Sequence, residues 1–140
     1  MHKRELTLTS FEPEVRAFVE KPWIGRLATV SADGFPHAVP LWYMLDGDDV
    51  VIISERKTAK VTNLLRDNRA ALVVGGEPDQ GPAYLIRGHV SITDDPDHVW
   101  LSKLTYHYES PTEAAKDLAE WGYMDIVLIR LEVERVTKVQ

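Results

Sequence analysis

The sequence predicts a mainly β domain with peripheral helices, folded as a small and mostly antiparallel barrel of six strands. Three β-type runs joined by tight turns occupy the stretch from Ile24 to Ser54, and three further runs follow. Helical patterns lie before, between and after these runs. Residues 1–140 contain no internal repeat, linker or low-complexity segment, so we expect one domain.

The chain begins with a polar segment, residues 1–10, which is expected to form a loose arm. Apolar residues then recur at helical spacing from Phe11 to Val19, with Ser10 as a candidate N-cap. Pro22 ends this helix, since proline cannot continue it.

Six strands follow from alternating or continuous apolar runs bounded by turn residues. The first two form a hairpin, because Asp33-Gly34 between them places glycine where positive φ is cheap. The strands are expected at Ile24–Ser31, Pro36–Met44, Val50–Ser54, Ala70–Gly75, Ala83–Thr93 and Asp125–Val139.

The third strand is followed at once by a predicted helix over Thr58–Asp67, with Val61, Leu64 and Leu65 as its inward stripe. Two more helices precede the last strand. Asp95-Pro96 opens one, with proline at its first position. The capping-box pattern of residues 110–113 opens the other, which runs to about Gly122.

The composition excludes several classes of function. A net charge of −6 argues against a nucleic-acid-binding module, and the chain has no cysteine for thiolate chemistry or disulfides. No run is long and apolar enough to span a membrane, and no secretory signal is visible, so the expected location is the cytosol.

The histidines lack metal-ligand spacing, so no metal site is predicted. They are His2, His37, His89, His98 and His107.

Three cations surround the start of the predicted helix at Thr58: Arg56, Lys57 and Lys60. Cations at a helix N-terminus oppose the helix dipole, so this cluster suggests an anionic partner such as a phosphate. The alternative is a solvated helix start with Thr58 as its N-cap.

The segment Pro40-Leu41-Trp42-Tyr43 has two interpretations. It is a packed strand whose aromatic rings fill the core, or it is a ligand-facing bend, since proline removes a ladder donor. Aromatic residues of the later helices are expected to lie in the core or an interface. These are Trp100, Tyr106, Tyr108 and Trp121.

In their order and spacing, these segments resemble the pyridoxamine 5′-phosphate oxidase-like, FMN-binding split-barrel superfamily, and its small flavin/deazaflavin-dependent oxidoreductase branch most of all. The matching pieces are Leu27-Ala28-Thr29-Val30, Asp33-Gly34, Pro36-His37, Val39-Pro40-Leu41-Trp42-Tyr43, Val51-Ile52-Ile53-Ser54, Thr58-Ala59-Lys60-Val61, Asn63-Leu64 and Asp67-x-Arg69-Ala70-Ala71-Leu72. The resemblance implies a six-stranded split β-barrel that forms a homodimer, with two cofactor sites in grooves between the subunits.

The resemblance also implies the cofactor contacts. The ring would lie along the second strand, against Val39, Pro40, Leu41 and Trp42. The ribityl phosphate would meet Ile53, Ser54, Thr58 and Lys60. This chain has Ala59-Lys60 where FMN oxidases of the family carry an Arg-Lys pair, so Arg56 or Lys57 is expected to reach the phosphate instead. The C-terminal residues that grip substrate in true pyridoxamine phosphate oxidases have no clear match, so pyridoxal phosphate synthesis is not expected.

The implied activity is hydride transfer between bound FMN, or the deazaflavin coenzyme F-420, and an unidentified small molecule. No side chain stands out as an acid or base; His37, Tyr43 and Arg87 are candidates. Two alternatives stay open. One is a binding protein that sequesters flavin, haem or another ligand without turnover, and the other is a purely structural dimeric barrel.

Overall fold

The computed structural model describes residues 6–8 and 11–139, which form eight strands and four helices. In chain order the elements are β1 (Leu6–Leu8), α1 (Pro13–Val19), β2 (Gly25–Val30), β3 (Pro36–Leu41), β4 (Met44–Asp46), β5 (Asp49–Glu55), α2 (Ala59–Arg66), β6 (Arg69–Gly75), β7 (Ala83–Asp94), α3 (Val99–Tyr108), α4 (Pro111–Glu120) and β8 (Ile126–Lys138). Within the described residues, no helix has the length and apolar character needed to cross a membrane.

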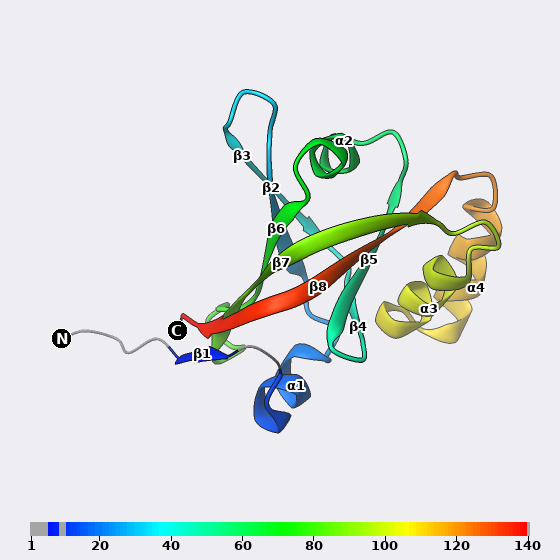
Figure 1. The fold of residues 1–140 in the computed structure, drawn as a ribbon. Coiled ribbons are helices and arrows are strands. Elements are labelled where there is room, and N and C mark those ends of the chain that lie inside the picture. Colours follow the sequence, from blue (N-terminus) through cyan, green and yellow to red (C-terminus); the bar gives the residue numbers. More distant parts are fainter. Residues whose placement is uncertain (1–5, 9–10, 140) are drawn as a thin grey trace.

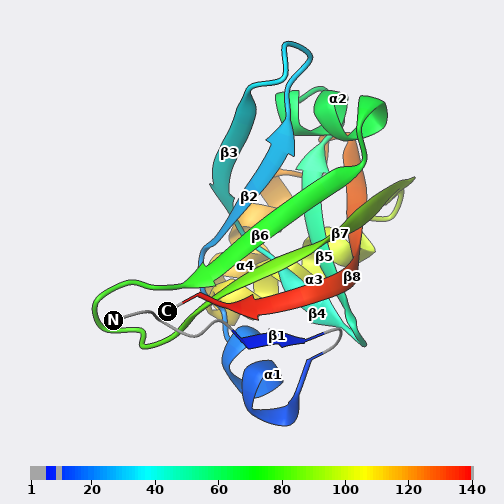
Figure 2. The same cartoon turned by 60° about the vertical axis from the view of Figure 1, so that its left-hand side comes forward.

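All the strands belong to one antiparallel sheet of order β3-β2-β6-β7-β8-β5-β4, with β1 paired to β8. The sheet is strongly curled, as Figures 1 and 2 show, but the pairing runs as an open path that ends at β3 and β4. The expected barrel is therefore a split one whose hydrogen-bond ladder does not close among the described strands.

The core fills the concave side of the sheet, with side chains such as Leu27, Ile52, Leu72 and Ile129 fully buried. Helices α1 and α2 lie at opposite ends of the sheet (Figure 1). They contribute buried residues to this core: Val15 and Val19 from α1, and Val61 and Leu64 from α2. Helix α3 covers the outer side of β5 and β8, where Val51, Leu104 and Leu128 form a second apolar cluster.

Each of the six predicted strand segments contains a strand, but the sheet has eight strands and not six, because β1 and β4 were not predicted as separate strands. Leu6–Leu8, expected within a loose arm, pairs with β8; the rest of that arm, with the Ser10 cap, lies outside the described residues. The predicted strand Pro36–Met44 is interrupted after Leu41, which separates β4 from β3.

Two helix predictions need correction. Leu65, expected in the inward stripe, is 72% exposed, because Val61 and Leu64 take the buried face of α2. Helix α3 begins at Val99 rather than at Pro96. The buried carboxylate of Asp95 still serves the helix start, since it accepts hydrogen bonds from the backbone N–H groups of residues 100 and 101.

Candidate functional site

Strand β3 ends the sheet and presents two different faces. Pro36, Ala38 and Pro40 are exposed, whereas the alternate residues are half-buried and face the concave side. One of these half-buried residues is His37, whose Nδ1 is buried and has no hydrogen-bond partner among the described residues. An unpaired buried nitrogen calls for a partner that the chain itself does not provide.

The break between β3 and β4 is held by the hydroxyl of Tyr108. This hydroxyl accepts a hydrogen bond from the backbone N–H of Tyr43, at 3.0 Å. It lies 2.7 Å from the carbonyl oxygen of Trp23 and 2.9 Å from that of Tyr43, either of which can accept its proton. One side chain of α3 thus replaces the ladder partners that the strand loses at its bend.

The same tyrosine fixes the ring of Trp42. The two rings are stacked, with centroids 4.8 Å apart and planes within 5°. Trp42 and Ile53, the latter near the end of β5, pack against the apolar cluster under α3. Two predicted cofactor contacts, one from the break after β3 and one from β5, therefore share one apolar surface.

The turn from β5 into α2 carries two hydroxyl groups. The hydroxyls of Ser54 and Thr58 lie 3.0 Å apart, and each also donates toward the carbonyl oxygen of Glu55. Thr58 occupies the N-cap position, as predicted, yet its side chain makes no capping hydrogen bond. The N-terminal N–H groups of α2 are therefore not capped by this residue.

The three cations of this turn lie in different surroundings. Arg56 is bound by carboxylates, with Asp94 at 2.5 Å and Asp125 at 2.8 Å, and these hydrogen bonds raise its pKa. Lys57 is exposed. Lys60 is half-buried and forms no ion pair within residues 6–8 and 11–139. Burial lowers its pKa, while the charge of Glu55 acts in the opposite direction.

Lys60 lies on the face of α2 that packs against the sheet. It precedes Asn63 by three residues and Leu64 by four, so the three side chains share one face. The Asn63 amide donates to the hydroxyl of Thr29, and Thr29 is the direct cross-strand partner of His37. Lys60 and the unpaired nitrogen of His37 therefore lie on the same end of the concave side.

Among the candidate acid–base residues, Tyr43 is wrongly placed for such a role. Its side chain is fully buried, and its hydroxyl donates to the carbonyl oxygen of Val19 at 2.5 Å. Burial raises its pKa far above the usual value. Tyr43 is a structural residue of the core, whereas Arg87 lies on β7 and lines a cavity on the convex face of the sheet.

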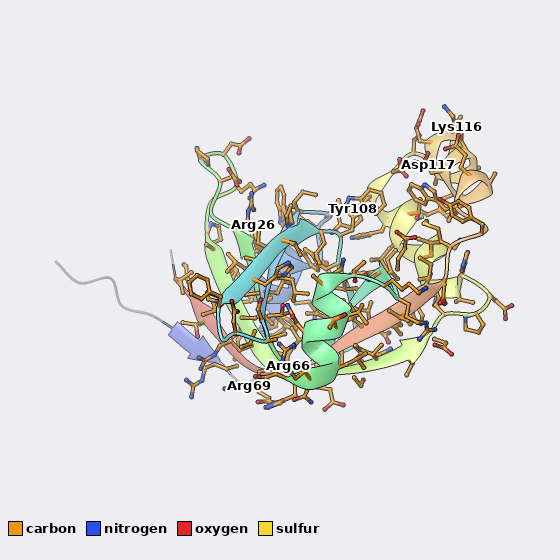
Figure 3. The ribbon with its side chains drawn as sticks, turned by 90° about the horizontal axis from the view of Figure 1, so that it is seen from above. Arg26, Arg66, Arg69, Tyr108, Lys116 and Asp117 are labelled. Carbon is orange, nitrogen blue, oxygen red and sulfur yellow. The ribbon has the colours of Figure 1, made fainter. Side chains whose placement is uncertain are left out.

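A cavity of about 520 Å³ lies on that convex face, and none of the predicted cofactor-binding residues is among the described residues lining it. Arg69, Arg87, His89 and Arg135 contribute its charged groups together with Glu134. In Figure 3, Arg69 lies on the opposite side of the β2–β3 pair from Tyr108. Sequence analysis did not identify this region; Gly88 is a signal that could have indicated it, because a glycine inside a strand marks a bulge or a close backbone approach.

Comparisons with known proteins agree with the fold. The family model for pyridoxamine 5′-phosphate oxidase matches residues 11–140. A solved structure named as an F-420 reductase is 26% identical, with a TM-score of 0.71, over 86% of this chain and 94% of that one. A conserved hypothetical protein from Mycobacterium tuberculosis is 24% identical, with a TM-score of 0.70, over 90% of this chain and 82% of that one.

A haem-binding protein from Mycobacterium smegmatis has the same fold, at 23% identity and a TM-score of 0.63. The match covers 89% of this chain and 51% of that one. No curated protein sequence matches this chain. With the family model spanning almost all of its length, the chain belongs to the pyridoxamine 5′-phosphate oxidase family of split-barrel proteins.

Proposed function

We propose that this protein is an oxidoreductase that holds FMN, or in its place the deazaflavin coenzyme F-420, along β3 and at the start of α2. The substrate is a small molecule that the chain does not identify. The observation that carries the proposal is Lys60, a half-buried cation without an ion-pair partner in the described chain, beside an uncapped helix start. Desolvating an ammonium group is costly unless an anion offsets it.

The residues present fit a phosphorylated cofactor. The ammonium of Lys60 and the N-terminal N–H groups of α2 are donors suited to a phosphate at the start of α2. The hydroxyls of Ser54 and Thr58 would join them by turning from the carbonyl oxygen of Glu55 to the phosphate. Arg56 fits this role less well, since its guanidinium is already bound by two carboxylates. Lys57 is the second cation available to an anion at this turn.

The strand and its bend fit an aromatic ring system. Val39, Pro40 and Leu41 offer an edge strand with apolar side chains. Trp42 is held rigidly by its stack on Tyr108, so the ring-binding surface is formed before any ligand arrives. The unpaired Nδ1 of His37 provides a hydrogen-bonding group on the same strand.

The bound cofactor would supply the hydride chemistry, and the protein's part is to bind, orient and exclude water. Lys60 and the two hydroxyls would fix the phosphate end, and β3 would orient the ring. The solved structure named as an F-420 reductase supports the deazaflavin alternative. The haem-binding neighbour has the same fold. Haem is therefore the ligand with which to test the alternative of a non-catalytic binding protein.

We further propose a homodimer in which the second copy covers the site. Strand β3 ends the sheet and is half-exposed, an arrangement that natural proteins usually cover. Two large apolar side chains next to the site support this, since Phe35 and Leu65 are each 72% exposed.

The test is to titrate the purified full chain separately with FMN, coenzyme F-420 and haemin, following absorbance or fluorescence. We expect FMN or F-420 to bind at about one site per chain and to be reduced when an electron donor is added. Lys60→Ala should weaken that binding roughly tenfold or more, as loss of a charge-assisted hydrogen bond does. Lys116→Ala, an exposed lysine on α4 far from the site (Figure 3), is the matched control.

Three outcomes would count against the proposal. Unchanged affinity in Lys60→Ala would remove the phosphate site. Binding of haemin alone would indicate a haem-sequestering protein. Tight flavin binding without any reduction by nicotinamide or chemical donors would indicate a binding protein rather than an enzyme.

A further inference from the structure

Arg26 is a charged residue of β2 that lies beside the proposed ring surface. In the pairing of β2 with β3 it is directly opposite Pro40, so the two side chains share one face of the sheet. Both residues are exposed on that face. Trp42, two residues after Pro40, packs against the apolar cluster on the outer side of the sheet. Arg26 therefore lies on the same side as two predicted ring contacts.

Within the described residues, Arg26 has a single ion-pair partner, Glu77. Its guanidinium donates a hydrogen bond to the Glu77 carboxylate at 3.0 Å. The two side chains remain 49% and 47% exposed. An exposed ion pair of this kind contributes little to stability, so a ligand group can replace Glu77 at small cost.

Glu77 belongs to the loop of residues 76–82, which joins β6 to β7 and lies beside Arg26 (Figure 3). The neck of the loop is closed, since the backbone N–H of Gly76 donates to the carbonyl oxygen of Pro82 at 3.1 Å. Beyond this neck, the bond to Arg26 is the only side-chain hydrogen bond that the loop makes within the described residues. Release of Glu77 would therefore free the tip of the loop without disturbing the core.

Arg26 lies some distance from the proposed phosphate site. Helix α2 contacts β2 at Thr29, whose hydroxyl accepts a hydrogen bond from the amide of Asn63. Arg26 precedes Thr29 by three residues, which is about 10 Å along a strand. The alternation of side chains also places the two residues on opposite faces. A ligand with its phosphate at the start of α2 would therefore present its ring end to Arg26.

We propose that Arg26 is a ligand-binding residue of this site and that Glu77 is its internal competitor. In the free protein, Glu77 holds the guanidinium. In the complex, Arg26 would donate hydrogen bonds to an oxygen acceptor at the ring end of the ligand, and the loop would lose its tether. This inference rests on the proposed function, because it needs a ring along β3. It adds a residue that recognises the ring rather than the phosphate.

The test compares FMN with riboflavin, which has the same ring system and no phosphate. Binding to the full chain is followed by flavin fluorescence. If coenzyme F-420 binds in place of FMN, its phosphate-free deazaflavin chromophore replaces riboflavin. Arg26→Gln should weaken the binding of both ligands roughly tenfold, as loss of a charge-assisted hydrogen bond does. Lys60→Ala should weaken the binding of the phosphorylated ligand only.

Glu77→Gln should act in the opposite direction, because it removes the competitor. The affinity should rise roughly two- to fivefold, the range expected for loss of an exposed ion pair. In an Arg26→Gln background the same change should have no effect, since no guanidinium is left to release.

Asp79→Asn is the matched control for the loss of a negative charge. Asp79 is an exposed acidic residue of the same loop and forms no ion pair within the described residues. Its affinity for either ligand should equal that of the wild type. Arg26, Glu77 and Asp79 are all exposed, so each variant should fold with the thermal midpoint of the wild type.

The outcomes separate this inference from the proposed function. Unchanged affinity in Arg26→Gln, with weaker FMN or F-420 binding in Lys60→Ala, overturns the inference and leaves the proposed function intact. Binding of no flavin or deazaflavin by the wild type overturns both. A gain from Glu77→Gln that persists in the Arg26→Gln background overturns the inference, since Glu77 would then act by charge repulsion alone. Arg26→Gln that dissociates an oligomer at unchanged affinity also overturns it, and assigns Arg26 to a contact between copies.

Discussion

Removing the hydroxyl of Tyr108 should destabilise the protein more than any other loss of a single oxygen atom from α3. In Tyr108→Phe the ring keeps its place on Trp42, so the perturbation is confined to hydrogen bonds. The backbone N–H of the fully buried Tyr43 loses its acceptor, and the carbonyl oxygens of Trp23 and Tyr43 lose their shared donor.

The magnitude follows from these contacts. A buried N–H group left without a partner costs about 1–3 kcal/mol, and the lost O–H donation contributes about 0.5–1.5 kcal/mol. Because the single hydroxyl proton serves one acceptor at a time, the donation is counted once. The expected loss in the free energy of unfolding is therefore about 1.5–4.5 kcal/mol. At a urea m-value of about 2 kcal/mol/M, the midpoint should fall by roughly 0.8–2.2 M.

Equilibrium urea unfolding, followed by circular dichroism, measures this loss directly. Tyr106→Phe is the control, since Tyr106 lies on the same helix, is 47% exposed and has no side-chain hydrogen bond within the described residues. Its free energy of unfolding should change by less than about 0.5 kcal/mol. If Tyr108→Phe unfolds at the wild-type midpoint, or if the control loses as much, the hydroxyl does not hold the bend.

Two further predictions concern Gly88 and the proposed phosphate site. Gly88→Ala should destabilise the protein by about 1–3 kcal/mol or more in urea unfolding, because its Cβ would collide with the backbone of Glu132. Gly122→Ala, whose Cβ would meet no atom closer than 3.9 Å, should stay within about 0.5 kcal/mol, and equal losses would refute the close-approach argument. The affinity for the proposed cofactor should fall as pH rises through the pKa of Lys60, beginning below 10.5 because burial lowers that pKa. Titrations from neutral to alkaline pH should show this fall in the wild type and a flat profile in Lys60→Gln; parallel profiles would exclude Lys60 as the titrating group.

Much of the fold could be predicted from local patterns in the sequence. Alternating apolar residues located all six long strands, and Asp33-Gly34 located the hairpin turn. The short strand Leu6–Leu8 escaped prediction because its order comes from pairing with β8 at the far end of the chain. Pairing partners that distant leave no signal in the local pattern.

The break in the second predicted strand has the same kind of cause. Pro40 indicated a bend, since proline removes a ladder donor. The hydroxyl that holds the bend belongs to Tyr108, which is 65 residues from Tyr43 along the chain. A solitary tyrosine on a predicted helix gives no indication of which backbone groups its hydroxyl will reach. The segment Pro40–Tyr43 is both packed and bent, whereas a ligand at this bend stays a prediction.

The cationic cluster shows why spacing in the sequence does not settle a binding site. Arg56, Lys57 and Lys60 lie within five residues of one another, yet each has a different environment in the fold. Arg56 is neutralised by carboxylates from β7 and from the segment before β8, whereas Lys60 is drawn into the protein without a carboxylate to pair with in the described chain. Conversely, Arg87 and Arg135 are far apart in the sequence and directly opposite in the sheet. A positive charge indicates a ligand when the fold desolvates it, and that depends on partners that are distant in the sequence.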